Sequence, residues 1–380
     1  MKFLKLRISL LPLPWKTIIS YLAIFFLWFT TGIRPSRAAT QDAALPDLVE
    51  KVAPGVVNIS STKFVKSPMF YGSPGMNDVF SQFFGMPEGQ VQKQSSLGSG
   101  FIIDSNGYIL TNNHVVENSD EIMILMLDKR HLPAKIIGRD KAMDLALLQL
   151  KGGSNVKDIK PLTLGNSETV RIGESVFAIG NPFGLQHTVT SGIISAKNRT
   201  IGLGAYDRFL QTDASINFGN SGGPLFNMKG EVIGINTAIN AAGQGLGFAT
   251  PIDEAQKHVE EFKKYGRIIR PWLGLVGQNI NPAIQRYYDL PEDHGVVVTN
   301  LAMKAPSVKA GIKAGDVIVS VNGTPVKETY DIQRELAKMK ADQTVSIQLR
   351  RGSSEQNVLL TKQVKLAVAP DLENLPQGIL

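Results

Sequence analysis

The sequence contains no cysteine among its 380 residues, and it has only five histidines. Thiolate zinc sites, a cysteine nucleophile and a disulfide framework are therefore excluded. It also lacks a His-Glu-x-x-His segment, the arrangement that places two zinc-binding histidines on one helix face. We therefore set aside a metal-dependent hydrolase and expect neither a metal nor another cofactor.

Acidic residues are missing from the first 39 positions, and this absence explains most of the net charge of +7. Residues 40–380 contain 34 basic side chains against 33 acidic ones once the basic residues of that segment are set aside. The basic residues of the segment are Lys2, Lys5, Arg7, Lys16, Arg34 and Arg37. A nearly neutral body shows no basic footprint of the kind that binds nucleic acid. We expect no nucleic-acid partner.

The charge-free run at residues 17–33 is mostly apolar and lies between a basic start and the small residues Ala38 and Ala39. This pattern is typical of an export signal. Cleavage near Ala39 would release a soluble protein, whereas an uncleaved run is just long enough to span a membrane as an anchor. We expect residues 1–39 to be a signal peptide or an N-terminal anchor of a periplasmic or otherwise exported protein, with the cleaved form favoured.

Long helical patterns are scarce between residues 40 and 265, where short apolar runs alternate with turn signals. Many short strands with few helices predict a β-barrel or sandwich domain. The expected strands are Gly98–Asp104, Tyr108–Thr111, Ile122–Leu127, Ala134–Gly138, Leu145–Leu150, Ser175–Ile179, Thr188–Ala196 and Glu231–Thr237. Residues 66–97 predict a long loop that carries aromatic side chains. Helical spacing appears only in residues 252–262, with Gly266 as the stop.

A linker at residues 266–271 separates this region from a second, smaller domain. Strands are expected at Leu273–Val276, Gly295–Thr299, Val317–Val321 and Thr344–Arg350, and one helix at Thr329–Lys340. The domain ends near residue 367, and residues 368–380 predict a tail. About 100 residues is an ordinary domain size.

Ser221 stands among glycines in Gly219-Asn220-Ser221-Gly222-Gly223-Pro224. Glycines permit unusual backbone dihedrals and a close approach by substrate. They also leave successive N–H groups able to point at one oxyanion. The segment alone is equally typical of a Gly-rich turn between strands. Its interpretation depends on whether a base and an acid accompany the serine.

His114 and Asp144 are the base and acid that fit such a serine. His114 ends a predicted strand between apolar runs, and Asp144 directly precedes the apolar strand 145–150. Taken singly, a hydrogen-bonded core histidine and a capping aspartate are the simpler interpretations. The competing histidines lie in polar or loop contexts: His131, His187, His258 and His294. The order His, Asp, Ser at strand edges of one β-rich domain favours a catalytic set.

Five segments spread over this region resemble the HtrA/Deg-type serine proteases, a chymotrypsin-like family. They are Gly98–Ile103, Leu110–Val116, Asp144–Leu148, Ile179–Gly184 and the Ser221 segment. The resemblance implies a mainly β fold of two six-stranded chymotrypsin-like β-barrels, followed by a small α+β PDZ domain. It implies that His114 and Asp144 come from the first barrel and Ser221 from the second. It also implies an oxyanion hole made by the N–H groups of Gly219 and Ser221.

The same resemblance implies a substrate pocket for the P1 side chain lined by Ile216, Asn240 and Leu246. Ser215, six positions before the nucleophile, is not an acid, so a Lys or Arg substrate side chain finds no fixed partner charge. A small aliphatic P1 residue is predicted. Asn240 departs from the apolar residue expected there, and Phe218 departs from a small or polar residue.

Trp272, Leu273, Gly274 and Leu275 follow Pro271 in a segment that resembles the carboxylate-binding loop of a PDZ domain. Later segments, Lys309–Ile318 and Val321–Gly323, resemble further PDZ motifs. A PDZ domain binds the free C-terminus of a peptide as an added strand. The resemblance also implies a homotrimer or a multiple of trimers, and coupling of peptide binding to loops 66–97, 181–187 and 240–246.

The resemblance implies an exported, ATP-independent serine endopeptidase that degrades misfolded or damaged proteins, with a chaperone activity as an additional expectation. Its domains are a protease domain at 40–265, a PDZ domain at 266–367 and a tail at 368–380. A membrane contact is expected only if residues 17–33 are retained. The alternative is a peptide-binding scaffold or holdase with an inactive protease domain. The presence of all three of His114, Asp144 and Ser221 argues against it.

Overall fold

A computed structural model describes residues 45–66, 91–151, 158–180, 187–201, 208–217, 219–237, 245–288, 295–352 and 356–370. Side chains of residues 64–66, 91–95, 287, 288 and 357 are excluded from the description. Several predictions fall outside these ranges. They concern the leader at 1–39, most of the loop 66–97, residues 181–186, Phe218, Asn240, His294 and the end of the tail.

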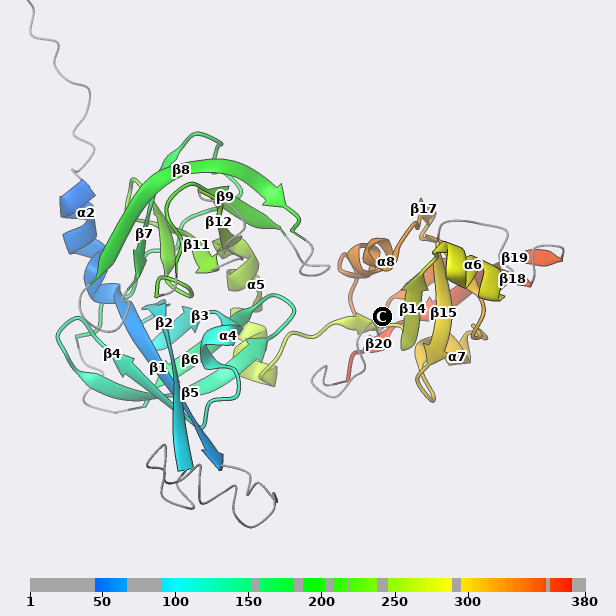
Figure 1. The fold of residues 1–380 in the computed structure, drawn as a ribbon, viewed down its shortest axis with the longest axis horizontal. Coiled ribbons are helices and arrows are strands. Elements are labelled where there is room, and N and C mark those ends of the chain that lie inside the picture. Colours follow the sequence, from blue (N-terminus) through cyan, green and yellow to red (C-terminus); the bar gives the residue numbers. More distant parts are fainter. Residues whose placement is uncertain are drawn as a thin grey trace, which may run out of the picture. The chain divides into compact units, whose positions relative to one another are not determined.

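The first barrel closes six antiparallel strands in the order β1-β2-β3-β6-β5-β4 (Figure 1). A short helix α2 (Leu45–Val52) and a 3-10 turn η1 (Ala53–Gly55) lead into it. Its strands are β1 (Val56–Lys66), β2 (Val91–Ile102), β3 (Tyr108–Thr111), β4 (Glu121–Leu125), β5 (His131–Asp140) and β6 (Leu145–Leu150). Helix α4 (Asn113–Val116) interrupts the path from β3 to β4.

The second barrel repeats this design with the order β10-β11-β12-β9-β8-β7. Its strands are β7 (Ser175–Gly180), β8 (Thr188–Arg199), β9 (Phe209–Thr212), β10 (Pro224–Asn227), β11 (Val232–Thr237) and β12 (Gly247–Pro251). The predicted fold of two six-stranded barrels is confirmed. Closure leaves neither sheet with an open edge, which is the usual solution for antiparallel sheets of this size.

Strands of both barrels are apolar on two faces because each face has its own core. In β6, Ala146 and Leu148 point into the first barrel, whereas Leu145 and Leu147 join the core that the two barrels share. Phe177 and Phe226 of the second barrel stack in that shared core with ring centroids 4.9 Å apart. Burying each such side chain contributes about 1.5–3 kcal/mol. The shared core therefore fixes the barrels against each other.

Helix α5 (Ile252–Tyr265) follows β12 (Figure 1). Its buried residues Ile252, Ala255, Val259 and Phe262 join the core that the two barrels share. Ile252 and Phe262 are fully buried in the shared core, and a Cβ at Gly138 of β5 would lie 2.7 Å from the Phe262 side chain. The helix ends at Gly266, whose φ of 72° and N–H bond to the Phe262 carbonyl form the predicted C-terminal cap.

The C-terminal domain is built on a sheet with the order β14-β15-β16-β18-β19, and β17 pairs with β16. Its strands are β14 (Leu275–Asn279), β15 (Val296–Leu301), β16 (Val317–Val321), β17 (Thr324–Pro325), β18 (Thr344–Gly352) and β19 (Asn357–Lys365). A separate pair joins β13 (Pro271–Trp272) to β20 (Ala367–Val368). The helices are α6 (Pro282–Tyr288), α7 (Pro306–Lys309) and α8 (Thr329–Leu336). The domain has its own core, around Val298, Ile318 and Leu349.

The expected elements are present, but several boundaries differ. Residues 91–97, expected in a loop, belong to β2 because they pair in register with β1 as far as Lys66 and Val91. Residues 367 and 368 form β20, and Ala369 is buried with its N–H bonded to the Arg270 carbonyl. The expected tail therefore begins with packed residues.

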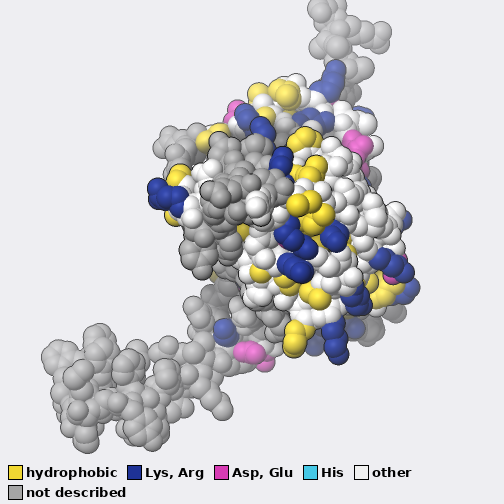
Figure 2. Space-filling view, turned by 90° about the vertical axis from the view of Figure 1, so that its right-hand side faces the viewer, with side chains coloured by type: hydrophobic (Ala, Val, Ile, Leu, Met, Phe, Trp, Pro, Cys, Tyr) yellow, Lys and Arg dark blue, Asp and Glu magenta, His cyan; other side chains and the backbone are white. Residues whose placement is uncertain are grey.

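The surface view in Figure 2 shows Lys and Arg side chains scattered among apolar and other polar groups on one face of the molecule. Exposed apolar side chains of the C-terminal domain include Met303, Val308, Val358 and Leu359. Within the described ranges, no helix has the length and apolar character needed to cross a membrane.

Candidate active site

His114 and Asp144 are joined by two hydrogen bonds. The Asp144 Oδ2 atom lies 2.7 Å from His114 Nδ1, and Oδ1 accepts the His114 backbone N–H at 2.9 Å. The His114 side chain is 43% exposed and that of Asp144 is 26% exposed, so the imidazole is accessible to a ligand. One carboxylate thus fixes both the ring and the backbone of the histidine. The sequence predicts His114 at the end of a strand. In the structure β3 ends at Thr111, Asn112 is an extended N-cap, and His114 lies in the helical turn α4.

Asp144 is presented by a tight turn between β5 and β6. Its φ is +50°, a conformation that is uncommon for a non-glycine residue. Two side chains hold this backbone: Asp140 Oδ1 accepts the Met143 N–H at 2.8 Å, and Asn112 Nδ2 donates to the Asp144 carbonyl at 2.9 Å. Strained backbone of this kind persists where surrounding contacts determine it, often at functional sites.

Asp140 itself lies in a buried ion pair with Arg270, the last residue before β13. Arg270 Nη2 donates to Asp140 Oδ1 at 2.9 Å, and Nη1 contacts Oδ2. Both side chains are less than a tenth exposed. The turn that carries Asp144 is therefore anchored to the segment that leads into the C-terminal domain.

Ser221 lies in the turn before β10 of the second barrel, with its Oγ buried. No described residue forms a hydrogen bond with that Oγ. The structure thus brings His114 and Asp144 together, while the serine is placed in the loop facing the strand that leads to His114. Catalytic hydrogen bonds are often long in unliganded proteins and tighten only in a complex.

The glycines beside Ser221 are required by the close approach of the first barrel. A Cβ at Gly222, whose φ is +80°, would lie 2.3 Å from both the Ser99 carbonyl oxygen and Thr111 Oγ1. A Cβ at Gly223 would lie 3.1 Å from the Ser99 side chain of β2, and 2.6 Å from the Ile179 carbonyl oxygen of β7 in its own barrel. The nucleophile loop therefore fits against β2 and β3 only with glycine at these positions.

The backbone N–H groups of Gly219 and Ser221 donate to no acceptor within the described residues. Gly219 takes a φ of +107°, which is available mainly to glycine. The neighbouring N–H groups are engaged: Asn220 N–H bonds to the Asn217 carbonyl at 3.2 Å, and Gly222 N–H to the Asn236 carbonyl at 2.7 Å. Among the described residues, the two N–H groups on either side of Asn220 therefore have no acceptor.

Two of the three residues expected to line the substrate pocket are described. Ile216 is half-buried and packs on the core of the second barrel, against Gly247. Leu246 is half exposed, and Asn240 lies outside the described residues. Ser215 is exposed, and its carbonyl accepts bonds from Thr190 Oγ1 and Asn220 Nδ2 at 3.0 Å each. The described side chains of this group are uncharged.

The expected peptide-binding loop lies between β13 and β14. Gly274 has a φ of +77°, and a Cβ there would lie 2.3 Å from the Ala305 side chain. The carbonyls of Leu273 and Gly274 accept the N–H groups of Ser307 and Ala302 at 3.0 and 2.9 Å. Among the described residues, neither Leu273 nor Gly274 donates its own N–H to an acceptor. Trp272 belongs instead to β13, and Leu275 begins β14, an edge strand of the described sheet.

The other histidines that the structure describes make contacts that do not involve Ser221. His131 is exposed at the start of β5, and His258 Nδ1 lies 3.0 Å from Glu261 Oε2 on the same helix. His187 Nε2 lies 3.3 Å from the Val56 carbonyl oxygen. Burial lowers the pKa of His187 below its ordinary value, and the bond to Val56 only partly opposes this. This contact links the second barrel to the first.

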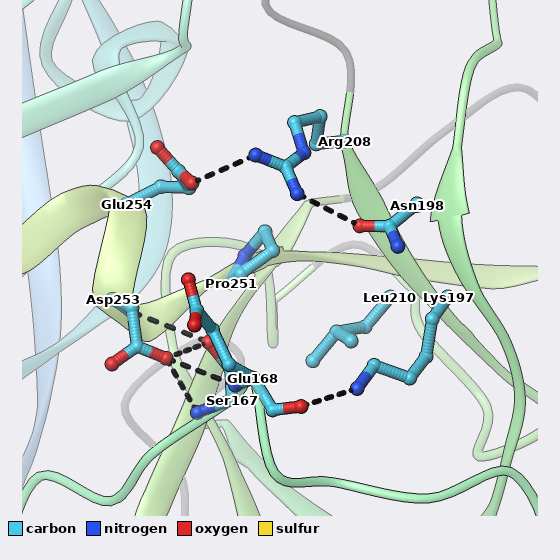
Figure 3. Close-up of a pocket in the computed structure, with 9 residues that line it drawn as sticks. All are labelled: Ser167, Glu168, Lys197, Asn198, Arg208, Leu210, Pro251, Asp253 and Glu254. Carbon is cyan, nitrogen blue, oxygen red and sulfur yellow. Dashed lines mark hydrogen bonds and ion pairs between the residues drawn. The ribbon is translucent and has the colours of Figure 1, made fainter.

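A separate cavity of about 260 Å³ lies beside the N-terminus of α5 (Figure 3). Asp253 accepts bonds from the Ser167 backbone and hydroxyl, and Arg208 lies 3.5 Å from Glu254. Lys197 donates to the Glu168 carbonyl at 2.7 Å. Arg208 and Glu254 pair with each other, Asp253 and Lys197 bond to Ser167 and the Glu168 carbonyl respectively, and no histidine lines the cavity. Its contacts fasten helix α5 to the second barrel rather than assembling a nucleophile and a base.

Sequence inspection did not single out Asn112, Asp140 or Ser99 individually. Asn112 and Ser99 lie inside the segments that carried the family resemblance, so the motifs pointed to them without assigning a role. Asp140 and Arg270 had no local signal, because the two residues bind each other across 130 positions of the chain.

Comparison with known proteins agrees with this architecture. Residues 98–235 match the trypsin-like peptidase domain family, and residues 273–361 match the PDZ domain family. A periplasmic serine endoprotease, DegP-like, of Pseudomonas putida (strain W619) is 40% identical over 362 residues, covering 90% of this chain and 74% of the relative. A similarly named protein of Hahella chejuensis is 38% identical, covering 89% and 74%.

Solved structures give the same result. The HtrA-type protease AlgW with a decapeptide is 36% identical, with a TM-score of 0.67 over 86% of this chain and 99% of that one. A serine endoprotease from Yersinia pestis is 31% identical, with a TM-score of 0.61 over 86% and 98%. The two barrels, the His114–Asp144 pair beside the Ser221 loop and these matches together show that the chain belongs to the HtrA-type, DegP-like periplasmic serine endoproteases with one PDZ domain.

Proposed function

We propose that Ser221, His114 and Asp144 form the catalytic triad of this endoprotease, with the N–H groups of Gly219 and Ser221 as its oxyanion hole. The observation that carries the proposal is the pair of hydrogen bonds that join the Asp144 carboxylate to the ring and to the backbone N–H of His114. This contact fixes Nδ1–H on the carboxylate side and leaves Nε2 free as a base, which is the role of the acid in such a triad.

The reaction begins when Ser221 Oγ attacks the scissile carbonyl carbon and its proton passes to His114 Nε2. Asp144 stabilises the imidazolium that forms, and the carbonyl oxygen takes the negative charge against the two free N–H groups. The imidazolium returns the proton to the leaving amine as the C–N bond breaks. Water, deprotonated by His114, then hydrolyses the acyl-enzyme and restores Ser221.

Substrate selection is proposed to rest on the pocket formed by Ile216, Leu246 and Asn240. Because Ser215 and the two described lining residues are uncharged, a Lys or Arg side chain would lose hydration there without gaining an ion pair. Small aliphatic P1 residues, such as Val or Ala, should be cleaved best. Fluorogenic peptides that differ only in Val or Lys at P1 test this, and a preference for Lys would contradict it.

The C-terminal domain is proposed to bind peptide C-termini at Leu273, Gly274 and Leu275, with Trp272 supporting the loop from β13. The N–H groups of Leu273 and Gly274, which have no acceptor among the described residues, suit a terminal carboxylate, and β14 presents an edge to an added strand. Substrates are proposed to be unfolded or damaged proteins, degraded without ATP, with chaperone activity in addition. We further propose a homotrimer or a multiple of it, exported by residues 1–39 with cleavage, or anchored by residues 17–33 without it.

A fluorophosphonate probe and unfolded casein test the nucleophile. Wild-type protein should be labelled and should cleave casein, and Ser221→Ala should do neither. Ser167→Ala is the matched control, because Ser167 is likewise a buried serine of the protease region, but its Oγ donates to Asp253 and no histidine lines its surroundings. It should keep labelling and cleavage.

Retained cleavage by Ser221→Ala would place the nucleophile elsewhere. A wild type that neither labels nor cleaves, even with a C-terminal peptide added, would favour the scaffold alternative. N-terminal sequencing of the exported protein distinguishes a cleaved leader from an anchor.

A further inference from the structure

Ser99 contacts both residues whose N–H groups are proposed to form the oxyanion hole. Its hydroxyl donates to the Gly219 carbonyl at 2.5 Å, and its backbone N–H donates to the Ser221 carbonyl at 2.9 Å. The residue is fully buried in β2 of the first barrel, whereas the loop belongs to the second. One residue of the first barrel therefore holds two carbonyls of the nucleophile loop.

The hydroxyl bond fixes one peptide plane. The peptide between Gly219 and Asn220 has its oxygen bound by Ser99 and its N–H bound by the Asn217 carbonyl. With this plane held, the direction of the Gly219 N–H depends on the torsions of Gly219 itself. A glycine at a φ of +107° has little intrinsic resistance to rotation. Without the Ser99 hydroxyl, the Gly219 carbonyl would be buried with one donor fewer.

Ser99 is in turn set by the strand that leads to His114. Thr111 Oγ1 donates to the Ser99 carbonyl at 2.7 Å, and Thr111 lies three residues before His114. The flanking glycines allow this fit, since a Cβ at Gly98 would lie 2.7 Å from the Val115 side chain and one at Gly100 would lie 2.8 Å from that of Ile59. A chain of hydrogen bonds thus connects the base strand with the oxyanion loop.

We infer that Ser99 is a positioning residue that aligns the Gly219 N–H with the developing oxyanion, and that Thr111 holds Ser99 in register. This inference rests on the proposed roles of Ser221 and Gly219. Ser99 acts through Gly219 and does not touch substrate. Loss of its hydroxyl should weaken binding of the transition state more than binding of the substrate.

Ser99→Ala removes the hydroxyl without adding volume. Turnover of a fluorogenic peptide should fall about ten- to a hundred-fold, less than the ~10²–10³ that follows loss of an oxyanion donor itself. The KM should stay within about twofold. Affinity for a peptide aldehyde, whose adduct places an oxyanion in the hole, should fall in proportion to kcat. Thr111→Val, which keeps the shape, should give the same pattern with a smaller loss.

Ser61→Ala is the matched control. Ser61 is also a buried serine of the first barrel, and its Oγ donates to the Val115 carbonyl at 2.8 Å without contacting the nucleophile loop. It should lose comparable stability and keep kcat. Equal loss of kcat in Ser61→Ala and Ser99→Ala would assign the effect to a loosened barrel and overturn the inference, as would an unchanged kcat or a loss confined to KM.

Amide hydrogen exchange separates this inference from the proposed triad. Exchange in peptides covering residues 217–226 should speed up in Ser99→Ala and not in Ser61→Ala, and this readout does not depend on catalysis. If exchange responds but the wild type has no Ser221-dependent cleavage, the proposed triad fails. If the wild type cleaves through Ser221 and neither exchange nor kcat responds, only the role of Ser99 fails.

Discussion

The two halves of the candidate active site are held in different ways. The base half, His114 and Asp144, is fixed by bonds within the first barrel, including that from Asn112 to the Asp144 carbonyl. The nucleophile half, Gly219 and Ser221, belongs to the second barrel, but its carbonyls are bound by Ser99 of the first. The His114–Asp144 pair itself is therefore joined within one barrel, although Asn112 also donates to Thr237 Oγ1 of the second barrel at 3.2 Å. The oxyanion loop depends directly on the register between the barrels.

Because of this difference, substitutions in the two halves should have different effects. Changes at Asp144 should act on the base without moving the loop, and changes at the contact between the barrels, including Ser99 and Thr111, should act on the loop. The shared core around Phe177, Phe226 and Phe262 keeps that contact rigid, because close-packed interiors resist small displacements.

The largest effect is expected for Asp144→Asn, which changes only the base half of the site. An amide would present an N–H to His114 Nδ1 and favour the wrong tautomer, and such a change lowers kcat by about 10⁴-fold in a related triad. Steady-state cleavage of a fluorogenic peptide measures it, with Asp128→Asn, an exposed partner of Arg130, as control. A loss below tenfold would show that Asp144 does not orient the base.

A smaller but broader effect is expected for Gly222→Ala, which attacks the contact between the halves. Gly173→Ala is the control, because its φ of +90° is equally unfavourable for alanine but a Cβ there meets no atom within 4 Å. The control should lose about 1–2 kcal/mol of unfolding free energy. Gly222→Ala should lose more and also about 10² in kcat, since small misplacements are costly. Equal behaviour of the two variants in urea unfolding and in kcat would contradict this.

The smallest effect is expected for His187→Gln, which changes a pH-dependent link between the barrels. Burial lowers the pKa of His187 in the folded protein below its ordinary value of 6.5. The unfolded chain therefore binds the proton more readily than the folded protein does. The contribution of neutral His187 to the free energy of unfolding is present above pH 6.5 and is lost as the pH falls through the folded pKa. His187→Gln should flatten the acid side of the stability curve in urea unfolding between pH 7.5 and pH 5. The exposed control His131→Gln should leave the curve unchanged, and a wild-type slope in His187→Gln would refute the assignment.

Much of the base half was predictable from the sequence because its signals are local. The strand at Leu145–Leu150 was predicted with its observed bounds, since burial on both faces produces an uninterrupted apolar run. Gly266 was predictable because a left-handed helix cap strongly favours glycine. The helical turn at His114 was missed, as four residues carry no periodicity.

The contacts that hold the nucleophile half could not be predicted in the same way. Strands β10 and β12 are short, and they begin with proline and glycine respectively. In the sequence alone, such segments look like turns. Ser99 and Gly219 lie 120 positions apart, so their bond leaves no pattern along the chain. The polar residues 91–97 look like a loop, and only pairing with β1 makes them a strand.

The Asp140–Arg270 pair has a consequence for where this protein can be divided. Arg270 serves both sides of the expected boundary, since its side chain binds Asp140 and its carbonyl accepts the Ala369 N–H. A protease fragment ending at residue 265 would keep a buried carboxylate without its cation, and removing one partner of such a pair typically costs about 3–5 kcal/mol. An exchange of the C-terminal domain that keeps Asp140 should therefore keep Arg270 with the protease part, and we expect a fragment ending at residue 270 to be more stable than one ending at residue 265.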